Sequence, residues 1–149
     1  MKTTHTARAE MLIRKPASPV FNAFVDPNTI TKFWLAATSG PLAPGANVKW
    51  DFMVPGASAE VNVTVFEQDR RIVFDWSDGT QVELDFADLG DETTHVSVRN
   101  SGYGDDKVDD AIESTQGFTI VLCDLKTLLE RGRSAGLTKD KAALIERSL

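Results

Sequence analysis

The feature that most constrains the fold is a change of hydrophobic period near residue 100. Five segments between residues 48 and 100 are predicted to be strands, and four of them alternate apolar and polar side chains cleanly, which is typical of strands with one buried face. Short turns join them, and one turn contains Asp78-Gly79, a dipeptide that favours hairpins. Residues 105–131 instead carry apolar residues at helical spacing. We therefore expect an antiparallel meander whose apolar face is covered by one long helix.

The segment before these strands predicts two short helices. Ser18 and Asp26 each precede a Pro, and Pro is tolerated at the first position of a helix. Ser and Asp side chains accept hydrogen bonds from free backbone N–H groups at helix starts. We therefore expect helices over residues 19–25 and 27–34, with Ser18 and Asp26 as N-caps. Alternation over residues 9–13 predicts one earlier strand.

The length of 149 residues corresponds to about one domain. We expect a disordered N-terminal tail over residues 1–6, one domain over 7–132 and a C-terminal extension over 133–149. The extension is predicted to form a short helix capped at Thr138. Its expected apolar side consists of Ala142, Ala143 and Ile145.

Composition narrows the classes of function. The net charge of -6 disfavours nucleic-acid binding, because an acidic surface repels phosphates and no long basic cluster is present. A single cysteine, Cys123, excludes an internal disulfide and fits a reducing cytosol. The N-terminal residues lack the apolar stretch of a signal peptide, and no apolar run has the length of a membrane span. These observations predict a cytoplasmic protein.

Three segments carry a resemblance to a known family. They are IRKPASPVFNAFVDPNTITKFW (13–34), VFEQDRRIVFDW (65–76) and GFTIVLCDLKTLLERG (117–132). With the strands between them, these segments resemble the START-like, or SRPBCC, superfamily, and most closely the proteins related to the activator of heat shock protein 90 ATPase. Two departures leave the subfamily open: Ala46 follows Gly45 where many relatives have a second Gly, and Phe118 stands where a Trp is common.

The resemblance implies an α+β helix-grip fold, in which a curved antiparallel β-sheet wraps around a long C-terminal α-helix, with two short helices after the first strand. In this fold the sheet and the long helix enclose a cavity, and the two short helices close one end. Each inward-facing residue alone is most simply explained as core, whereas the set as a whole suits a flat apolar ligand. The residues predicted to contact such a ligand are Trp34, Trp50, Phe52, Val63, Phe74, Trp76, Leu84, Phe86, Val98, Asn100, Tyr103, Phe118 and Leu122. Ile112 is a further candidate from the helix.

The sequence offers little for catalysis. His5 and His95 are expected to lie apart, and no spacing of His, Cys, Asp or Glu is typical of a metal site. No catalytic residue, metal or cofactor is therefore predicted. Polar residues that could reach the cavity are Asn100, Glu60, Glu113, Thr115 and Gln116. For Asn100 a turn residue at the end of a strand is the favoured interpretation.

Three functions are consistent with these observations. The first is a binding module for an apolar or aromatic small molecule. The second is a small cyclase or hydrolase that uses a cavity acid, for which Glu60 or Glu113 would be the candidate. The third is a co-chaperone that binds a protein partner, as the resemblance implies. The eukaryotic activator has an additional N-terminal domain that this sequence lacks, so the first function is favoured.

Overall fold

The computed structural model describes residues 3–148, which form one seven-stranded antiparallel sheet and four α-helices. The strands lie side by side in the order β1-β7-β6-β5-β4-β3-β2. Along the chain the elements are β1 (Thr4–Ile13), α1 (Ala17–Val25), α2 (Pro27–Phe33), β2 (Leu35–Thr38), β3 (Asn47–Phe52), β4 (Ser58–Glu67), β5 (Arg71–Trp76), β6 (Gln81–Gly90), β7 (Thr93–Gly104), the 3-10 helix η1 (Asp105–Lys107), α3 (Val108–Arg131) and α4 (Leu137–Arg147).

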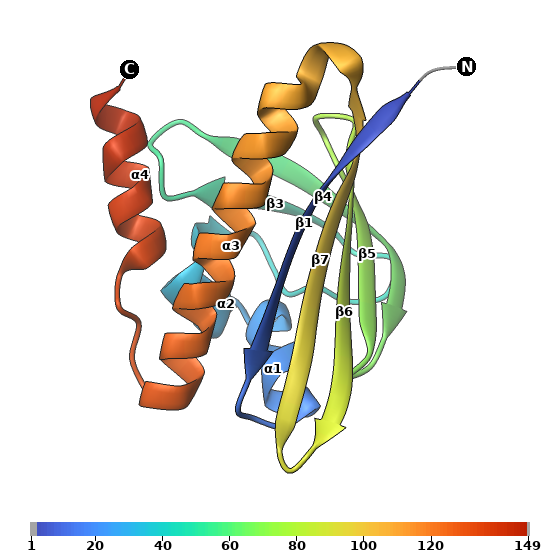
Figure 1. Ribbon diagram of the computed structural model, residues 1–149, viewed down its shortest axis with the longest axis vertical. Helices are drawn as coiled ribbons and strands as arrows, with labels where there is room; N and C mark the ends of the chain where they lie inside the picture. Colours follow the sequence, from blue (N-terminus) through green and yellow to red (C-terminus); the bar gives the residue numbers. More distant parts are fainter. Residues whose placement is uncertain (1–2, 149) are drawn as a thin grey trace.

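The long helix α3 covers one face of the curved sheet, as the change of period predicts. Figure 1 shows α3 between β1 on one side and α4 on the other, with α1 and α2 near its C-terminal end. Leu122 and Leu125 of α3 are fully buried against inward strand residues such as Phe74 and Leu84. The predicted α+β helix-grip architecture is therefore confirmed.

The first strand is longer than the alternation over residues 9–13 indicates. β1 begins at Thr4, which is paired with Gly104 of β7, so the prediction of a disordered tail is wrong for residues 4–6. Residues 1–2 lie outside the described part of the chain. Backbone pairing with a twelve-residue neighbour extends the strand, and this pairing leaves no mark in the local pattern.

Only one of the two predicted N-caps is confirmed. The Asp26 side chain accepts a hydrogen bond from the backbone N–H of Asn28 at 2.9 Å, directly before α2. Ser18 is not a cap, because α1 begins earlier, at Ala17, and has Pro16 as its N-cap. Ser18 therefore lies in the first turn of the helix.

A bulge in β4 interrupts the alternation of Val61, Val63 and Val65, which by itself predicts that all three face inward. Val61 and Val63 are buried as expected, but the pairing with β5 shifts between Val63 and Val65. The extra residue reverses the alternation, so Phe66 instead of Val65 packs against the core. The Phe66 ring meets Phe21 of α1 edge-on at 5.3 Å between ring centroids.

The C-terminal extension forms α4, which packs beside α3 (Figure 1). Its N-cap is Gly136, so the prediction of a cap at Thr138 is wrong. The Thr138 hydroxyl instead donates to the backbone carbonyl of Phe33 at 2.6 Å and ties α4 to the end of α2. Of the predicted apolar side only Ala142 is buried, whereas Ala143 and Ile145 are exposed.

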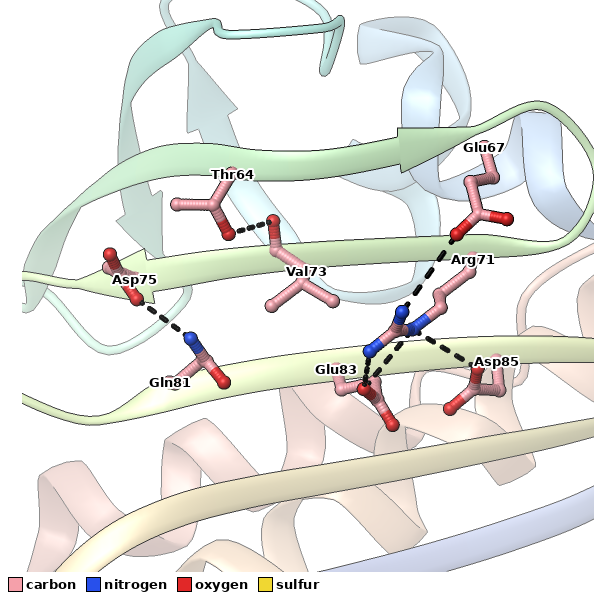
Figure 2. A network of polar contacts seen from close by, with 8 residues as sticks. All are labelled: Thr64, Glu67, Arg71, Val73, Asp75, Gln81, Glu83 and Asp85. Atoms are coloured by element: carbon pink, nitrogen blue, oxygen red, sulfur yellow. Dashed lines mark hydrogen bonds and ion pairs between the residues drawn. The ribbon is translucent and has the colours of Figure 1, made fainter.

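The outer face of the sheet carries a ladder of charged residues (Figure 2). Arg71 of β5 forms ion pairs with Glu83 and Asp85 of β6 and with Glu67 of β4. Partial burial, helped by the hydrogen bond and the charge of Glu83, raises the pKa of Asp85 to about 6. The hydrogen bond from Arg71 lowers the pKa of Glu83.

Candidate functional site

The candidate site is a pocket of about 380 Å³ at one end of the strands, between α3, α4 and the ends of β3 and β5. Its most apolar wall is aromatic and consists of Trp34, Phe52, Trp76 and Phe118. The opposite wall comes from α4, through Thr138, Lys141, Ala142 and Ile145. The β3–β4 turn adds Met53, Val54 and Ala57.

The aromatic wall is held by ring-to-ring contacts across three elements. Trp76 at the end of β5 stacks on Phe118 of α3, with ring centroids 5.7 Å apart and an angle of 15° between the planes. Trp34, directly after α2, meets both rings edge-on, at 5.5 Å from Phe118 and 6.4 Å from Trp76. The indole N–H of Trp76 is buried and has no hydrogen-bond partner among residues 3–148. An unpaired buried donor of this kind is rare in proteins.

The polar end of the pocket is a hydrogen-bond network centred on Asn100. Its side-chain oxygen accepts from the Tyr103 hydroxyl at 2.5 Å and from the Ser114 hydroxyl at 2.8 Å. Its side-chain nitrogen donates to Thr80 Oγ1 at 2.9 Å and to the backbone carbonyl of Gln81 at 3.1 Å. Burial raises the pKa of Tyr103, so this hydroxyl stays protonated at neutral pH.

The structure divides the predicted ligand-contact residues into two groups. Residues that line the pocket are Trp34, Phe52, Trp76, Tyr103 and Phe118. Residues that are buried elsewhere, without lining it, are Trp50, Val63, Phe74, Leu84, Phe86, Val98, Asn100 and Leu122. The middle of the sheet packs directly against the helices, so the open space lies at one end of the strands and not over the centre of the sheet.

Asn100 was expected at the end of a strand, in a turn, and that interpretation is wrong. It lies within β7 and its side chain is fully buried. Ile112 also differs from expectation: it is 61% exposed on the far side of α3 from the core. Among the polar candidates only Glu113 lines the pocket, while Glu60 is exposed on β4.

Sequence reasoning missed the contribution of α4 and of the β3–β4 turn. The helix could be predicted, but its docking place could not, because the anchor is the buried carboxylate of Asp124 in α3. That carboxylate accepts from the Ser134 hydroxyl at 2.7 Å and from the backbone N–H groups of Ala135 and Thr138 at 3.3 Å. Gly117 of α3 also lines the pocket, and a glycine inside a long helix was the one signal that pointed to it.

The histidines and the cysteine lie apart in the part of the chain that the structure describes. Among the described residues no three His, Cys, Asp or Glu side chains lie close enough to hold a metal ion. His5 pairs with Asp105 at one end of β1, and His95 pairs with Glu10 nearer the other end. Cys123 is partly buried on α3 and does not line the pocket. In the described part of the chain no helix is long and apolar enough to cross a membrane.

A curved antiparallel sheet closed around one long helix, with a pocket beside that helix, defines a helix-grip protein of the START-like class. The chain belongs to the family described as "Activator of Hsp90 ATPase homolog 1-like protein", whose model matches residues 14–130. The resemblance carried by the sequence segments is therefore confirmed. A comparison with curated proteins finds no match.

Solved structures share the fold at low sequence identity. Protein SSP2350 from Staphylococcus saprophyticus is 24% identical, with a TM-score of 0.78 over 87% of this chain and 95% of that one. DynU16, a putative protein in the dynemicin biosynthetic locus, is 24% identical, with a TM-score of 0.77 over 87% of this chain and 48% of that one. The Aha1 dimer from Colwellia psychrerythraea is 18% identical, with a TM-score of 0.79 over 87% of this chain and 99% of that one.

Proposed function

We propose that this protein binds a flat apolar or aromatic small molecule in the pocket between α3, α4 and the ends of β3 and β5. The observation that carries this proposal is the aromatic wall formed by Trp34, Trp76 and Phe118. A volume of about 380 Å³ lies within the range of small-molecule sites, which are mostly apolar with a few placed polar groups.

Gly117 supports the proposal, because neither backbone conformation nor close packing explains why a glycine lies inside this helix. Glycine inside a helix destabilises a protein by roughly 0.5–1 kcal/mol relative to alanine. The backbone of Gly117 does not have a positive φ, and a Cβ placed on it would meet nothing within 4 Å. The glycine therefore leaves open space at the pocket wall, directly before Phe118, whose ring completes the aromatic stack.

The unpaired indole N–H of Trp76 also supports the proposal. Leaving a buried donor unpaired costs about 1–3 kcal/mol. The indole N–H has no partner among the described residues, and its ring forms part of the pocket wall. A ligand oxygen that reached this N–H after a small rotation of the ring would remove that cost.

The two other predicted functions have less support. An acid–base enzyme needs a carboxyl group held in a desolvated site, but Glu113 is exposed and Glu60 lies outside the pocket. The co-chaperone function rests on the family description and on the Aha1 relative. It stays a prediction, and it becomes the leading one if ligand binding fails.

The uncharged fluorescent dye N-phenyl-1-naphthylamine tests the proposal. We expect saturable dye binding by the native protein and its displacement by naphthalene. Gly117→Leu should fill the pocket and abolish binding without unfolding the protein, since open space surrounds this position. Thr119→Leu is the matched control, because Thr119 is exposed on the same helix and does not line the pocket. No binding by the native protein, or equal binding by both variants, would refute the proposal.

A further inference from the structure

The orientation of the Asn100 side-chain amide is fixed by its surroundings. Its nitrogen lies 3.1 Å from the backbone carbonyl of Gln81, and a carbonyl oxygen can only accept hydrogen bonds. The NH₂ group must therefore face Gln81 and Thr80, and the amide oxygen must face Tyr103 and Ser114. Asn100 is 0% exposed, so water does not compete for these groups.

This orientation fixes the direction of every hydroxyl proton around Asn100. An amide oxygen only accepts, so the Tyr103 and Ser114 hydroxyls each donate their single proton to it. The Thr80 hydroxyl accepts a hydrogen bond from Asn100 and donates one to the Asp78 carboxylate at 2.7 Å. The chain of hydrogen bonds therefore runs in one direction and ends on a negative charge.

The hydroxyls that line the pocket consequently have no proton left for a ligand. Tyr103 and Ser114 donate to Asn100, and Thr138 donates to the carbonyl of Phe33. Each keeps only oxygen lone pairs for further contacts. Asp110 and Glu113, which line the same end of the pocket, are acceptors as carboxylates.

We propose that this pocket selects flat aromatic ligands that carry a hydrogen-bond donor, a hydroxyl or N–H group, at the Tyr103–Ser114 end. This inference rests on the proposed function, because it assigns the chemistry of the ligand at that site. At the Tyr103–Ser114 end, a ligand group that only accepts hydrogen bonds would bring its lone pairs against those of the two hydroxyls. An anionic ligand group placed there would also meet Asp110 and Glu113. Among the described lining residues Lys141 is the single cation. It donates one hydrogen bond to Gln116 at 2.9 Å, and the two carboxylates outnumber it.

Three naphthalenes of similar size test the inference on the native protein. 2-Naphthol carries a donor, 2-methoxynaphthalene has the same oxygen without its proton, and 2-naphthoate is an anionic acceptor. With dissociation constants measured by displacement of N-phenyl-1-naphthylamine, we expect 2-naphthol to bind about 5- to 10-fold more tightly than 2-methoxynaphthalene, which corresponds to one neutral hydrogen bond. 2-Naphthoate should bind most weakly.

Variants of the hydroxyl residues separate this inference from the proposed function. Ser114→Ala and Tyr103→Phe should each reduce the preference for 2-naphthol and leave the affinity for 2-methoxynaphthalene almost unchanged. Thr115→Ala removes a hydroxyl from the same helix, one that donates to the Ala111 carbonyl, and should keep the full preference. Equal affinities for 2-naphthol and 2-methoxynaphthalene would refute the donor preference while the proposed function stands. Binding of none of the three compounds would refute both.

Discussion

Asp26 ends one helix and begins the next. Its backbone N–H donates to the Asn22 carbonyl at 2.9 Å, and its side chain caps α2 through the N–H of Asn28. Asp26→Ala should lower the free energy of unfolding by about 0.5–2 kcal/mol, measured by urea denaturation. Ser18→Ala is the matched control, because Ser18 also precedes a Pro but makes no capping bond. A change of less than about 0.5 kcal/mol is expected there. Equal losses in the two variants would contradict the assignment of the caps.

The raised pKa of Asp85 predicts how the stability of the protein depends on pH. Its pKa in the folded protein is raised to about 6 from the ordinary 3.8, so folding favours its neutral form. Its contribution to stability is therefore full below the ordinary pKa and is lost as the pH rises through about 6. Asp85→Asn keeps the group neutral and should raise the thermal midpoint at pH 8, while near pH 4 the midpoint should barely change. The gain should be small, since the side chain is 39% exposed to solvent that screens its charge.

The pKa of Glu83 is shifted in the opposite direction, so its contribution to stability depends on pH in the opposite way. The hydrogen bond from Arg71 lowers its pKa, so its contribution is present above the ordinary pKa and is lost as the pH falls through the folded value. Glu83→Gln should therefore lower the thermal midpoint at pH 8 and have less effect in acid. A midpoint at pH 8 that falls in both Asp85→Asn and Glu83→Gln would show that the two carboxylates are not held as the structure indicates.

Among the secondary-structure elements, α4 depends most on one buried side chain. The Asp124 carboxylate is 1% exposed. It accepts hydrogen bonds from Ser134 and Ala135, which precede α4, and from Thr138 in the first turn of α4. Asp124→Ala should cost about 1–3 kcal/mol, because buried N–H groups lose their partner. Amide hydrogen exchange over residues 134–148 should become faster, and the affinity for N-phenyl-1-naphthylamine should fall.

Thr127→Ala is a suitable control for that experiment. Its hydroxyl donates to the Cys123 carbonyl within α3 and makes no contact that positions α4. Exchange over residues 134–148 should be the same as in the native protein. If Asp124→Ala leaves exchange in this segment unchanged, the carboxylate does not anchor α4.

Elements with one buried face and one solvent-exposed face could be predicted from the sequence. β3 to β7 and α3 are of this kind, because the apolar face of the sheet packs against the apolar face of the helix. β2 and the first half of β1 were missed. They are strands because their backbones pair with β3 and β7, and their own side-chain patterns do not indicate a strand. The bulge in β4 was missed for a similar reason: one unpaired residue between Val63 and Val65 changes the inward face without a sequence signal.

For the whole molecule the fold could be predicted, but the position of the pocket could not. Periodicity gives the side of the sheet on which Trp50 and Trp76 lie, and both face the helices. Periodicity does not predict the distance between the curved sheet and α3 along the helix. Trp50 is 1% exposed in the packed centre, whereas Trp76 lines the pocket from the end of β5. Leu122 and its neighbour Val121 on α3 are both buried in the core, but only Val121 lines the pocket, and periodicity does not distinguish them.

Ligand binding should also change the stability of the whole molecule. A ligand that binds only the folded state raises the free energy of unfolding by about 2.7 kcal/mol at one hundred times its dissociation constant. For a domain of this length that corresponds to a rise of roughly 5–10 °C in the thermal midpoint. We expect this rise with 2-naphthol in the native protein and in Thr119→Leu.

Gly117→Leu makes the same experiment specific for the pocket. Without ligand its midpoint should be equal to or above that of the native protein, because a leucine is a better helix former than glycine and the position has open space. With 2-naphthol its midpoint should not move, since the side chain occupies the space that the ligand needs. A rise in Gly117→Leu as large as in the native protein would place the ligand elsewhere on the molecule. A midpoint far below the native one without ligand would instead show that the space beside Gly117 is smaller than the structure indicates.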